Sequence, residues 1–302
     1  MPITIEEVVK KIDVWRDKML DIQEMPGGIT NENYRIDVDG RPYFVSIPGA
    51  STQFLGVDGS NKHYNTKAAS AIGVGPQVLH YLPEHQVMVL EFIHGETMSL
   101  ATMNNPGMPG RLAQVLLELH TAQRFLIDFN IFRLADFYLD ILDEHNWAVP
   151  AGYRRRMAVL GHMERAVSSP PFATVSCTND LVAENIIDIG ERLRLIDFDY
   201  SGNNDPCFEL GNACQELQYN ADQCAELCAA YFGAPRRHLL ARIHLYAISS
   251  DIVWSLWGAI QHEISQLDLD FWSYAIDRWE RAQVLLDSTE FPRWLEAAAR
   301  ES

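Results

Sequence analysis

Three polar residues near the middle of the chain have the types and the spacing that phosphoryl transfer requires. Asp180 is followed five residues later by Asn185, and Asp197 ends the apolar segment that comes after it. A carboxylate can accept the proton of an attacking hydroxyl group, and carboxylate and amide oxygens are hard ligands that suit Mg²⁺. The segment therefore predicts a base at Asp180 and a Mg²⁺ site at Asn185 and Asp197, next to nucleotide phosphates.

Short strands are expected to position these three residues. Apolar runs cover residues 173–177, 185–189 and 192–197, and Gly190-Glu191 provides a turn between the last two. A single Asp or Asn in a loop usually caps a turn, so no one of the three residues is informative alone. An ordered set that is separated by rigid apolar strands is how active sites are commonly built.

The first hundred residues predict a mixture of helices and strands. Thr4 and Glu7 have the spacing of a capping box, which begins a helix. Asp39-Gly40 is a strong hairpin signal between two alternating segments. The expected elements are, in order, a helix over 4–20, strands over 33–38 and 41–47, a helix over 58–72, and strands over 77–82 and 86–93.

Nearly all of the chain after residue 110 has helical periodicity, apart from the strands around Asp180. Strands with one main helix, then a short connection, then a helical body predict a two-lobed α+β protein. The small N-terminal lobe, with its antiparallel sheet, is expected over residues 1–93. The larger, mostly helical lobe is expected over 94–302, with a hinge near 90–97.

Composition narrows the class of protein. The chain has 302 residues, and its 41 Asp+Glu against 24 Lys+Arg give a net charge of -17, which disfavours nucleic acid as a partner. No apolar run approaches the length that spans a bilayer, and the charged, amphipathic start does not resemble a secretory signal. The five cysteines form no CxxC pair and have no zinc-ligand spacing. A cytoplasmic protein with reduced thiols, no membrane insertion and no nucleic-acid partner is expected.

The block around Asp180 resembles the choline/ethanolamine kinase branch of the aminoglycoside phosphotransferase-like family. The family pattern is roughly HNDL, then N, then IDFEY, and this chain has TNDL, Asn185 and IDFDY. The similarity runs from GGITNENYRI near the start to the aromatic segment near the end. It implies a protein-kinase-like fold that binds ATP and Mg²⁺ between its lobes. It also implies transfer of the γ-phosphate to the hydroxyl of a small amino alcohol, choline or ethanolamine, with Asp180 as the catalytic base.

The same resemblance suggests which residues hold the nucleotide. The glycine pair at 27–28 precedes the first hairpin, and a Gly-rich turn can bring backbone N–H groups close to phosphates. In the family this segment covers the nucleotide phosphates, which implies contacts from Asn31 and Asn33. MVLEFIHGE resembles the interlobe hinge of the family, where backbone groups of Glu91 and Ile93 would pair with adenine.

Aromatic residues near the C-terminus suggest a site for the acceptor. Trp254 and Trp257 are three residues apart and share a helix face. WSLWGAIQ and the later DFWSYA resemble the choline kinase pattern WGLWSIIQ…IEFGYxxYA, which places Trp254, Trp257 and Phe271 on its choline-facing aromatics. Aromatic faces bind quaternary ammonium groups, at about 0.5–2 kcal/mol per contact. FELGNACQEL resembles DIGNHFxEW, and Glu216 matches its acid, which would supply a carboxylate near the ammonium.

Three positions depart from the family pattern. The strand before IPG normally carries Arg or Lys, but here it has Ser46. Lys62 aligns with the Glu that normally pairs with that cation, and Thr178 replaces the His that begins the catalytic loop. We hypothesise that Lys62 reaches into the cleft and takes over the missing contact with the phosphates. Loss of the His is expected to loosen the geometry of Asp180 rather than to delete the chemistry.

Two alternatives stay open beside a purely structural partner protein, for which the chain carries no motif. One is a related phosphotransferase that acts on an aminoglycoside or another amino alcohol. The other is a catalytically weak or inactive pseudokinase that still binds ligand, which Ser46 and Thr178 suggest.

Overall fold

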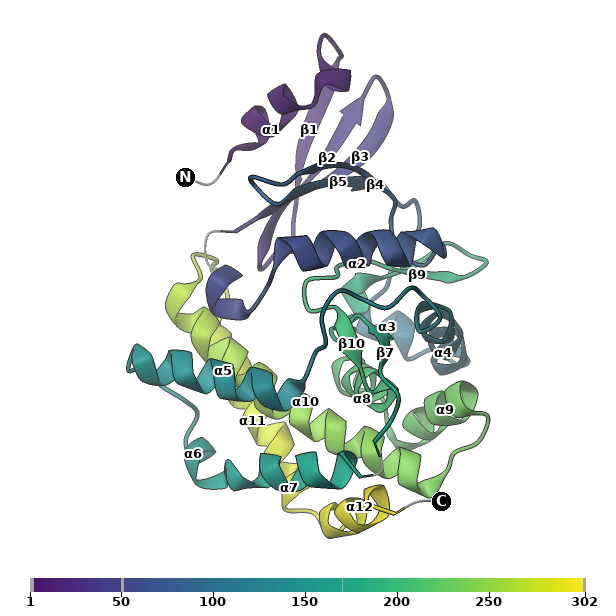
Figure 1. Cartoon of the computed structure of the whole chain (residues 1–302), viewed down its shortest axis with the longest axis vertical. Coiled ribbons are helices and arrows are strands. Elements are labelled where there is room, and N and C mark those ends of the chain that lie inside the picture. The colour runs from purple at the N-terminus through teal and green to yellow at the C-terminus, as the bar shows by residue number, and fades with distance from the viewer. Residues whose placement is uncertain (1–2, 50–51, 170, 301–302) are drawn as a thin grey trace.

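The computed structural model describes residues 3–49, 52–169 and 171–300, and it consists of two parts (Figure 1). The upper part in Figure 1 holds an antiparallel sheet with strand order β1-β2-β3-β5-β4. A short helix, α1 (Ile5–Lys11), and a 3-10 turn at Asp13–Trp15 precede this sheet. The strands are β1 (Leu20–Met25), β2 (Asn31–Val38), β3 (Arg41–Pro48), β4 (Val78–Leu82) and β5 (Val87–Glu91).

The β2–β3 hairpin forms as its turn residues predict. Asp39 and Gly40 have φ angles of 50° and 83°, and two successive positive φ angles match the right-handed twist of the flanking strands. The resulting register places Asn33 opposite Ser46, so both lie on neighbouring strands near the phosphate end of the expected site.

Helix α2 (Gly59–Ala71) lies between the sheet and the helical part (Figure 1). Asp58 caps it by accepting hydrogen bonds from the backbone N–H groups of Ser60 and Asn61. Its buried face is polar: the side chains of Asn61 and Asn65 both donate to the carbonyl oxygen of Ser201, at 2.9 and 3.1 Å. These bonds attach α2 to the C-terminal part and set the direction in which the neighbouring Lys62 points.

The C-terminal part is built around α10 (Arg237–Ile264), which is buried along most of its length. It packs against α5 (Ile131–Glu144), α7 (Ala158–Val167), α8 (Pro206–Glu216), α11 (Phe271–Leu286) and α12 (Phe291–Ala298). The remaining helices are α3 (Leu100–Met103), α4 (Met108–Leu119), α6 (Tyr153–Arg156) and α9 (Ala221–Phe232). Two small sheets carry the catalytic segment: β7 (Val175–Cys177) with β10 (Gly202–Asn204), and β6 (Glu96–Thr97) with β8 (Ile186–Asp188) and β9 (Leu193–Leu195).

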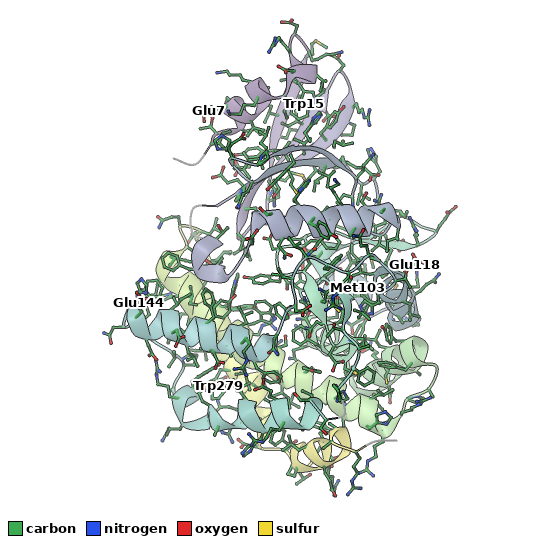
Figure 2. All side chains as sticks on the ribbon, in the orientation of Figure 1. Glu7, Trp15, Met103, Glu118, Glu144 and Trp279 are labelled. Atoms are coloured by element: carbon green, nitrogen blue, oxygen red, sulfur yellow. The ribbon has the colours of Figure 1, made fainter. Side chains whose placement is uncertain are left out.

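Two hydrophobic clusters correspond to the two parts. The smaller lies between α1 and the sheet and includes Trp15, which is 2% exposed and packs edge-on against Tyr43. The larger fills the helical part and includes Trp279; Figure 2 labels both tryptophans. Leu55, just before α2, and Ala69 within it belong to the larger cluster although they precede the hinge. The lobe boundary at residues 93 and 94 remains a prediction.

The two-lobed α+β prediction is confirmed, with one wrong element near the N-terminus. The Thr4–Glu7 capping box is present, but the helix ends at Lys11 rather than near residue 20. The amphipathic pattern does not separate a helix from the 3-10 turn that buries Trp15, and β1 was not predicted at all. The burial pattern of β1, which is exposed over its central residues, lacks the alternation that marks a strand in a sequence. Within the described ranges, no helix has both the length and the hydrophobicity to cross a membrane.

Candidate active site

The predicted catalytic loop follows β7 directly, and two side chains of α8 accept hydrogen bonds from it. The carboxylate of Glu209 accepts three hydrogen bonds: from the Thr178 backbone N–H (3.0 Å), the Thr178 hydroxyl (2.6 Å) and the Asn179 backbone N–H (3.1 Å). Two residues further on, the Leu181 N–H donates to the side chain of Asn212, also on α8. The loop is therefore fixed on both sides of Asp180. Thr178 replaces the expected His, and its hydroxyl still serves as a brace.

The backbone on either side of the site adopts uncommon conformations. Asn179, immediately before Asp180, has φ 64°, and Asp197 has φ 60°. For residues other than glycine this left-handed region costs free energy, and such residues concentrate at functional sites. The side chain of Asn179 compensates locally, because it donates to the Tyr200 carbonyl oxygen and accepts from the Asn204 amide. The strain lies at the two loops that carry the predicted base and metal ligand.

Asn185 is hydrogen-bonded to Asp180 and to the residue before Asp197. The Asn185 amide nitrogen donates to the backbone oxygen of Asp180 (3.1 Å), so its amide group is tied to the catalytic loop. The Asn185 backbone oxygen accepts from Ile196 N–H, one residue before Asp197. A carboxylate and an amide oxygen on two adjacent, mutually bonded loops are a donor set that fits Mg²⁺.

Lys62 reaches the same place from α2. Its side chain is 10% exposed, and its ammonium nitrogen lies 2.5 Å from an Asp199 carboxylate oxygen and 3.9 Å from one of Asp197. Burial acts to lower the pKa of Lys62, but the charges of Asp199 and Asp197 outweigh it, and the pKa is raised. Ser46, where the family has a cation, is a buried neutral residue on β3. The structure thus places one buried cation beside the predicted metal ligand, and it comes from the helix rather than the strand.

The two carboxylates around Lys62 have pKa values that are shifted in opposite directions. Burial and the neighbouring charge of Asp199 raise the pKa of Asp197 to about 6, although Lys62 acts in the opposite direction. For Asp199, burial acts to raise the pKa, but Lys62 and hydrogen bonds from Asn31 and Thr30 outweigh it, so the pKa is lowered. Asp199 is therefore the fixed negative partner of Lys62. Asp197 is the carboxylate that lacks full compensation by protein groups, as expected of a metal ligand.

The glycine-rich turn contacts the metal loop. The Thr30 hydroxyl and the Asn31 amide donate to the same oxygen of Asp199, at 3.0 and 2.8 Å. A Cβ at Gly28 would lie 2.1 Å from the Asn31 carbonyl oxygen and 2.8 Å from the Asn33 amide nitrogen, so only glycine fits there. Asn31 and Asn33 thus lie together beside the glycine-rich turn.

At the hinge the predicted residues lie at the end of β5. The Glu91 N–H donates to the Gln77 carbonyl oxygen (2.8 Å), so it is already used within the fold. The Glu91 carboxylate binds Arg194 of β9, which connects the end of the sheet to the helical part. Ile93 follows outside the sheet. Glu91 and Ile93 were the two residues proposed to contact adenine. The backbone N–H of Glu91 is therefore already occupied by a bond within the protein.

Asp180 lies where charges from both ends of the site act on it. Burial is the largest cause that raises the pKa of Asp180 well above its usual value, followed by the negative charges of Glu216 and Asp197. Arg278 acts in the opposite direction. A carboxylate with a raised pKa is a stronger proton acceptor, which suits a general base.

The aromatic residues predicted for the acceptor converge next to Asp180. Trp254 packs edge-on against Tyr200, with ring centroids 4.8 Å apart, and Trp257 packs edge-on against Phe271 and Tyr274 at 5.9 and 5.6 Å. The charge of Asp180 raises the pKa values of both tyrosines, although burial is the largest cause for each. The α10 and α11 aromatics therefore form one cluster beside the catalytic loop.

Glu216 belongs to the same region, but it already has a cationic partner. Both nitrogens at the tip of Arg278 bind Glu216, one of them at 2.7 Å. Arg278 also binds Asp251 (3.1 Å), and its guanidinium group lies 4.9 Å from the centre of the Tyr274 ring. The acid predicted to face an ammonium ion is thus neutralised by the protein itself.

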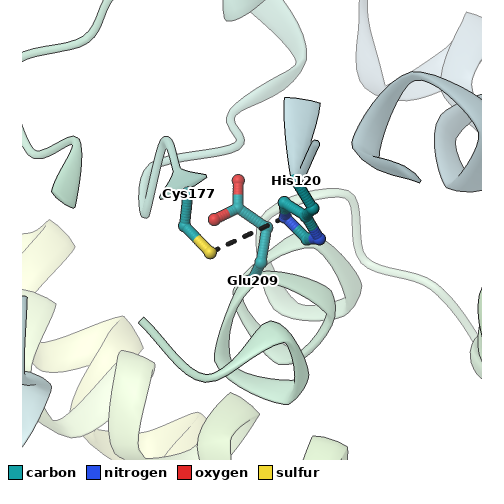
Figure 3. Close-up of side chains that lie close together, drawn as sticks. All are labelled: His120, Cys177 and Glu209. Carbon is teal, nitrogen blue, oxygen red and sulfur yellow. Dashed lines mark hydrogen bonds between the residues drawn. The ribbon is translucent and has the colours of Figure 1, made fainter. Parts of the chain in front are cut away.

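A second cluster of possible metal ligands lies behind the catalytic loop (Figure 3). The cluster consists of His120, Cys177 and Glu209. Each residue offers one ligand atom, and these three atoms lie within 4.8 Å of one another. The Glu209 oxygens already hold the loop, and the His120 ring is shared between Tyr231 and Cys177. Burial lowers the pKa of His120 to about 3, so its ring stays neutral. The cluster is a hydrogen-bonded support for the loop.

The brace at Thr178 leads to a first prediction. In Thr178→Val the side chain keeps its shape but loses its hydroxyl, so buried Glu209 keeps only two of its three hydrogen bonds. We expect the free energy of unfolding to fall by about 1–3 kcal/mol, because a buried charged acceptor loses a donor. Turnover is expected to fall with an unchanged KM for ATP. Denaturant titration and initial rates check both values, and a Thr178→Ser variant that matches the native protein is the control. An unchanged stability of Thr178→Val would contradict the brace.

Comparison with known proteins agrees with this geometry. A two-lobed fold with a buried lysine beside the carboxylates that follow its catalytic-loop segment is typical of a protein-kinase-like phosphotransferase. The family model for choline/ethanolamine kinase matches residues 22–229. A solved choline/ethanolamine kinase family protein from Mesorhizobium loti is 33% identical, with a TM-score of 0.84 and 96% of each chain covered. The chain belongs to the choline/ethanolamine kinase family.

Two further relatives are similar over most of their length. Choline kinase LicA from Streptococcus pneumoniae is 25% identical with a TM-score of 0.80, over 93% of this chain and 98% of that one. Ethanolamine kinase 2 from Mus musculus is 24% identical, over 88% of this chain and 76% of that protein. The protein is a phosphotransferase with an alcohol group as acceptor, kinases of its family use ATP, and the protein-kinase-like fold is confirmed.

Several residues of the site were not predicted from the sequence. Thr30 and Asp199 contact each other across the cleft, and Tyr274 and Arg278 complete the acceptor end. The last two had a usable signal, because Tyr274 and Arg278 follow Phe271 by one and two turns of the same helix and so share its face. The Thr30–Asp199 contact joins residues 169 positions apart, and no local pattern indicates it.

Proposed function

We propose that this protein is an ATP- and Mg²⁺-dependent cytoplasmic kinase that phosphorylates the hydroxyl group of choline or ethanolamine. The observation that carries the proposal is the position of Asp180 between two differently built ends. On one side lie the buried cation Lys62 and the carboxylates of Asp197 and Asp199. On the other side lie the aromatic rings of α10 and α11. The hinge is proposed near residues 90–97, between lobes 1–93 and 94–302.

At the nucleotide end, the backbone of Ile93 and the carbonyl group of Glu91 would face adenine, and Asn31 and Asn33 would contact the phosphates. Asn185 and Asp197 would hold Mg²⁺, which when bound neutralises charge on the transferring phosphoryl group. Lys62 would release part of its contact with Asp199 and face the phosphates. Its pKa is raised, so it carries the full charge that this role needs.

At the acceptor end, Trp254, Trp257 and Phe271 would bind the amino-alcohol head group, joined by Tyr274. Asp180 would accept a hydrogen bond from the hydroxyl group, orient its oxygen toward the γ-phosphate and take its proton. Positioning is the main contribution of the residues around Asp180, since Glu209 and Asn212 fix the loop on both sides. Glu216 would act on the acceptor only together with its partner Arg278.

The test is ADP formation by the purified protein with ATP and Mg²⁺, with choline, ethanolamine and a panel of aminoglycosides offered separately. Acceptor-dependent ADP formation with choline or ethanolamine is the expected result. Turnover of an aminoglycoside alone would favour the related phosphotransferase. Calorimetric binding of choline without any ADP formation would identify a pseudokinase, which Ser46 and Thr178 had suggested.

A further inference from the structure

The acceptor end carries its own cation. Arg278 is 7% exposed, and its guanidinium group makes hydrogen bonds to both carboxylate oxygens of Glu216. It also lies over the ring of Tyr274, at the distance of a cation–π contact. Arg278 therefore occupies two of the contacts that would otherwise be offered to an ammonium group, a carboxylate and an aromatic face.

The remaining charges at this end also balance. Asp251 accepts from Arg278 (3.1 Å) and Arg281 (2.5 Å), and its side chain is fully buried behind them. Two carboxylates, Glu216 and Asp251, thus face two guanidinium groups. Apart from the base itself, this end of the site offers no net negative charge to an acceptor.

Three unpartnered polar atoms of α10 are hydrogen-bond donors, and the unpartnered acceptor Asp251 Oδ2 belongs to the buried carboxylate whose other oxygen binds Arg278 and Arg281. Trp254 Nε1, Trp257 Nε1 and Gln261 Nε2 are buried without a hydrogen-bond partner in the described chain. They follow one another along one face of α10, at intervals of three and four residues. Such N–H groups cannot accept a hydrogen bond from an ammonium group.

From this arrangement we infer that Arg278 is a specificity-determining residue that favours quaternary over primary amino alcohols by occupying Glu216. The inference rests on the proposed function and deepens it by selecting choline over ethanolamine. A primary ammonium group loses up to three hydrogen bonds to water when it enters the site and needs acceptors to replace them. A trimethylammonium group donates no hydrogen bond, and aromatic faces suffice to bind it.

The experiment measures kcat/KM for choline and ethanolamine with the native protein and with Arg278→Gln. The native protein is expected to favour choline by about 10-fold or more, the value of a lost hydrogen bond to a charged group. In Arg278→Gln the carboxylate of Glu216 becomes free to accept from a primary ammonium. The ethanolamine-to-choline ratio is then expected to rise about 10- to 100-fold.

Two further variants isolate the cause. Arg278→Gln combined with Glu216→Gln removes the free carboxylate and restores local charge balance, so the ratio is expected to return toward the native value. Arg293→Gln is the control, because it removes an exposed arginine whose partner is Glu290 and leaves the pairs of Glu216 and Asp251 in place, and its ratio is expected to stay native.

The outcomes separate the inference from the proposed function. A native protein that prefers ethanolamine overturns the inference even where Arg278→Gln does not fold. If Arg278→Gln folds and its ethanolamine-to-choline ratio stays within about threefold of the native ratio, the inference is overturned too. Such a change is well below the effect of one hydrogen bond to a charged group. If the native protein turns over neither alcohol, the proposed function fails, and the inference fails with it.

Discussion

Asp180→Asn is expected to lower turnover by about 10²–10⁴-fold, the usual contribution of a general base. Asparagine keeps the size of the side chain but cannot accept the hydroxyl proton. ATP affinity is expected to change little, because the proposed nucleotide site consists of other residues, among them Lys62, Asn31 and Asp197. ADP formation with saturating choline measures the turnover, and calorimetric titration of ATP measures the affinity.

The control for this variant is Asp140→Asn, the same substitution at an exposed position of α5. It separates the loss of a carboxylate at the site from the loss of one negative charge in a protein of net charge -17. A fall in thermal stability of Asp180→Asn is not expected, because burial of the charged form raises the pKa of Asp180 and asparagine removes that charge. Normal turnover in Asp180→Asn would refute the assignment of the base.

Lys62→Met is expected to lower kcat/KM for ATP by about 10²–10³-fold, which is typical for removal of one preorganised charge or donor at a reacting phosphoryl or acyl group. The buried ammonium lies 2.5 Å from Asp199 and 3.9 Å from Asp197, and Ser46 provides no second cation on the strand. Lys62→Arg keeps the charge and is expected to retain part of the activity. Initial rates against ATP concentration give the values for all three proteins.

Two controls distinguish a phosphate contact from a structural ion pair. Lys67→Met changes an exposed lysine on the same helix and is expected to behave as the native protein. Ser46→Lys in the Lys62→Met background returns a cation to β3, and an increase of kcat/KM by about 10-fold or more is expected if the phosphates need a positive charge. Lost stability with no change in kcat/KM for ATP in Lys62→Met would instead mean that Lys62 only neutralises Asp199.

Local patterns were sufficient for the ordered set of chemical groups. Asp180, Asn185 and Asp197 were predicted from residue type, spacing and the apolar strands between them, and hydrogen bonds join Asn185 to Asp180 and to Ile196, the residue before Asp197. The hairpin at Asp39-Gly40 was also predictable, since its turn needs two positive φ angles. The strand β1 was not, because an exposed strand lacks alternating burial.

The sequence by itself determined the reaction class and predicted a base, because these depend on residue types at short spacings along one strand–loop–strand segment. Only the tertiary structure decided which charges are compensated. Lys62 meets Asp199 and Arg278 meets Glu216 across 137 and 62 positions of the chain. Such pairs form when separate helices pack, and burial then makes each unpaired charge costly. Whether a carboxylate is free to meet a ligand is therefore a property of the packed helices, and no local sequence pattern carries it.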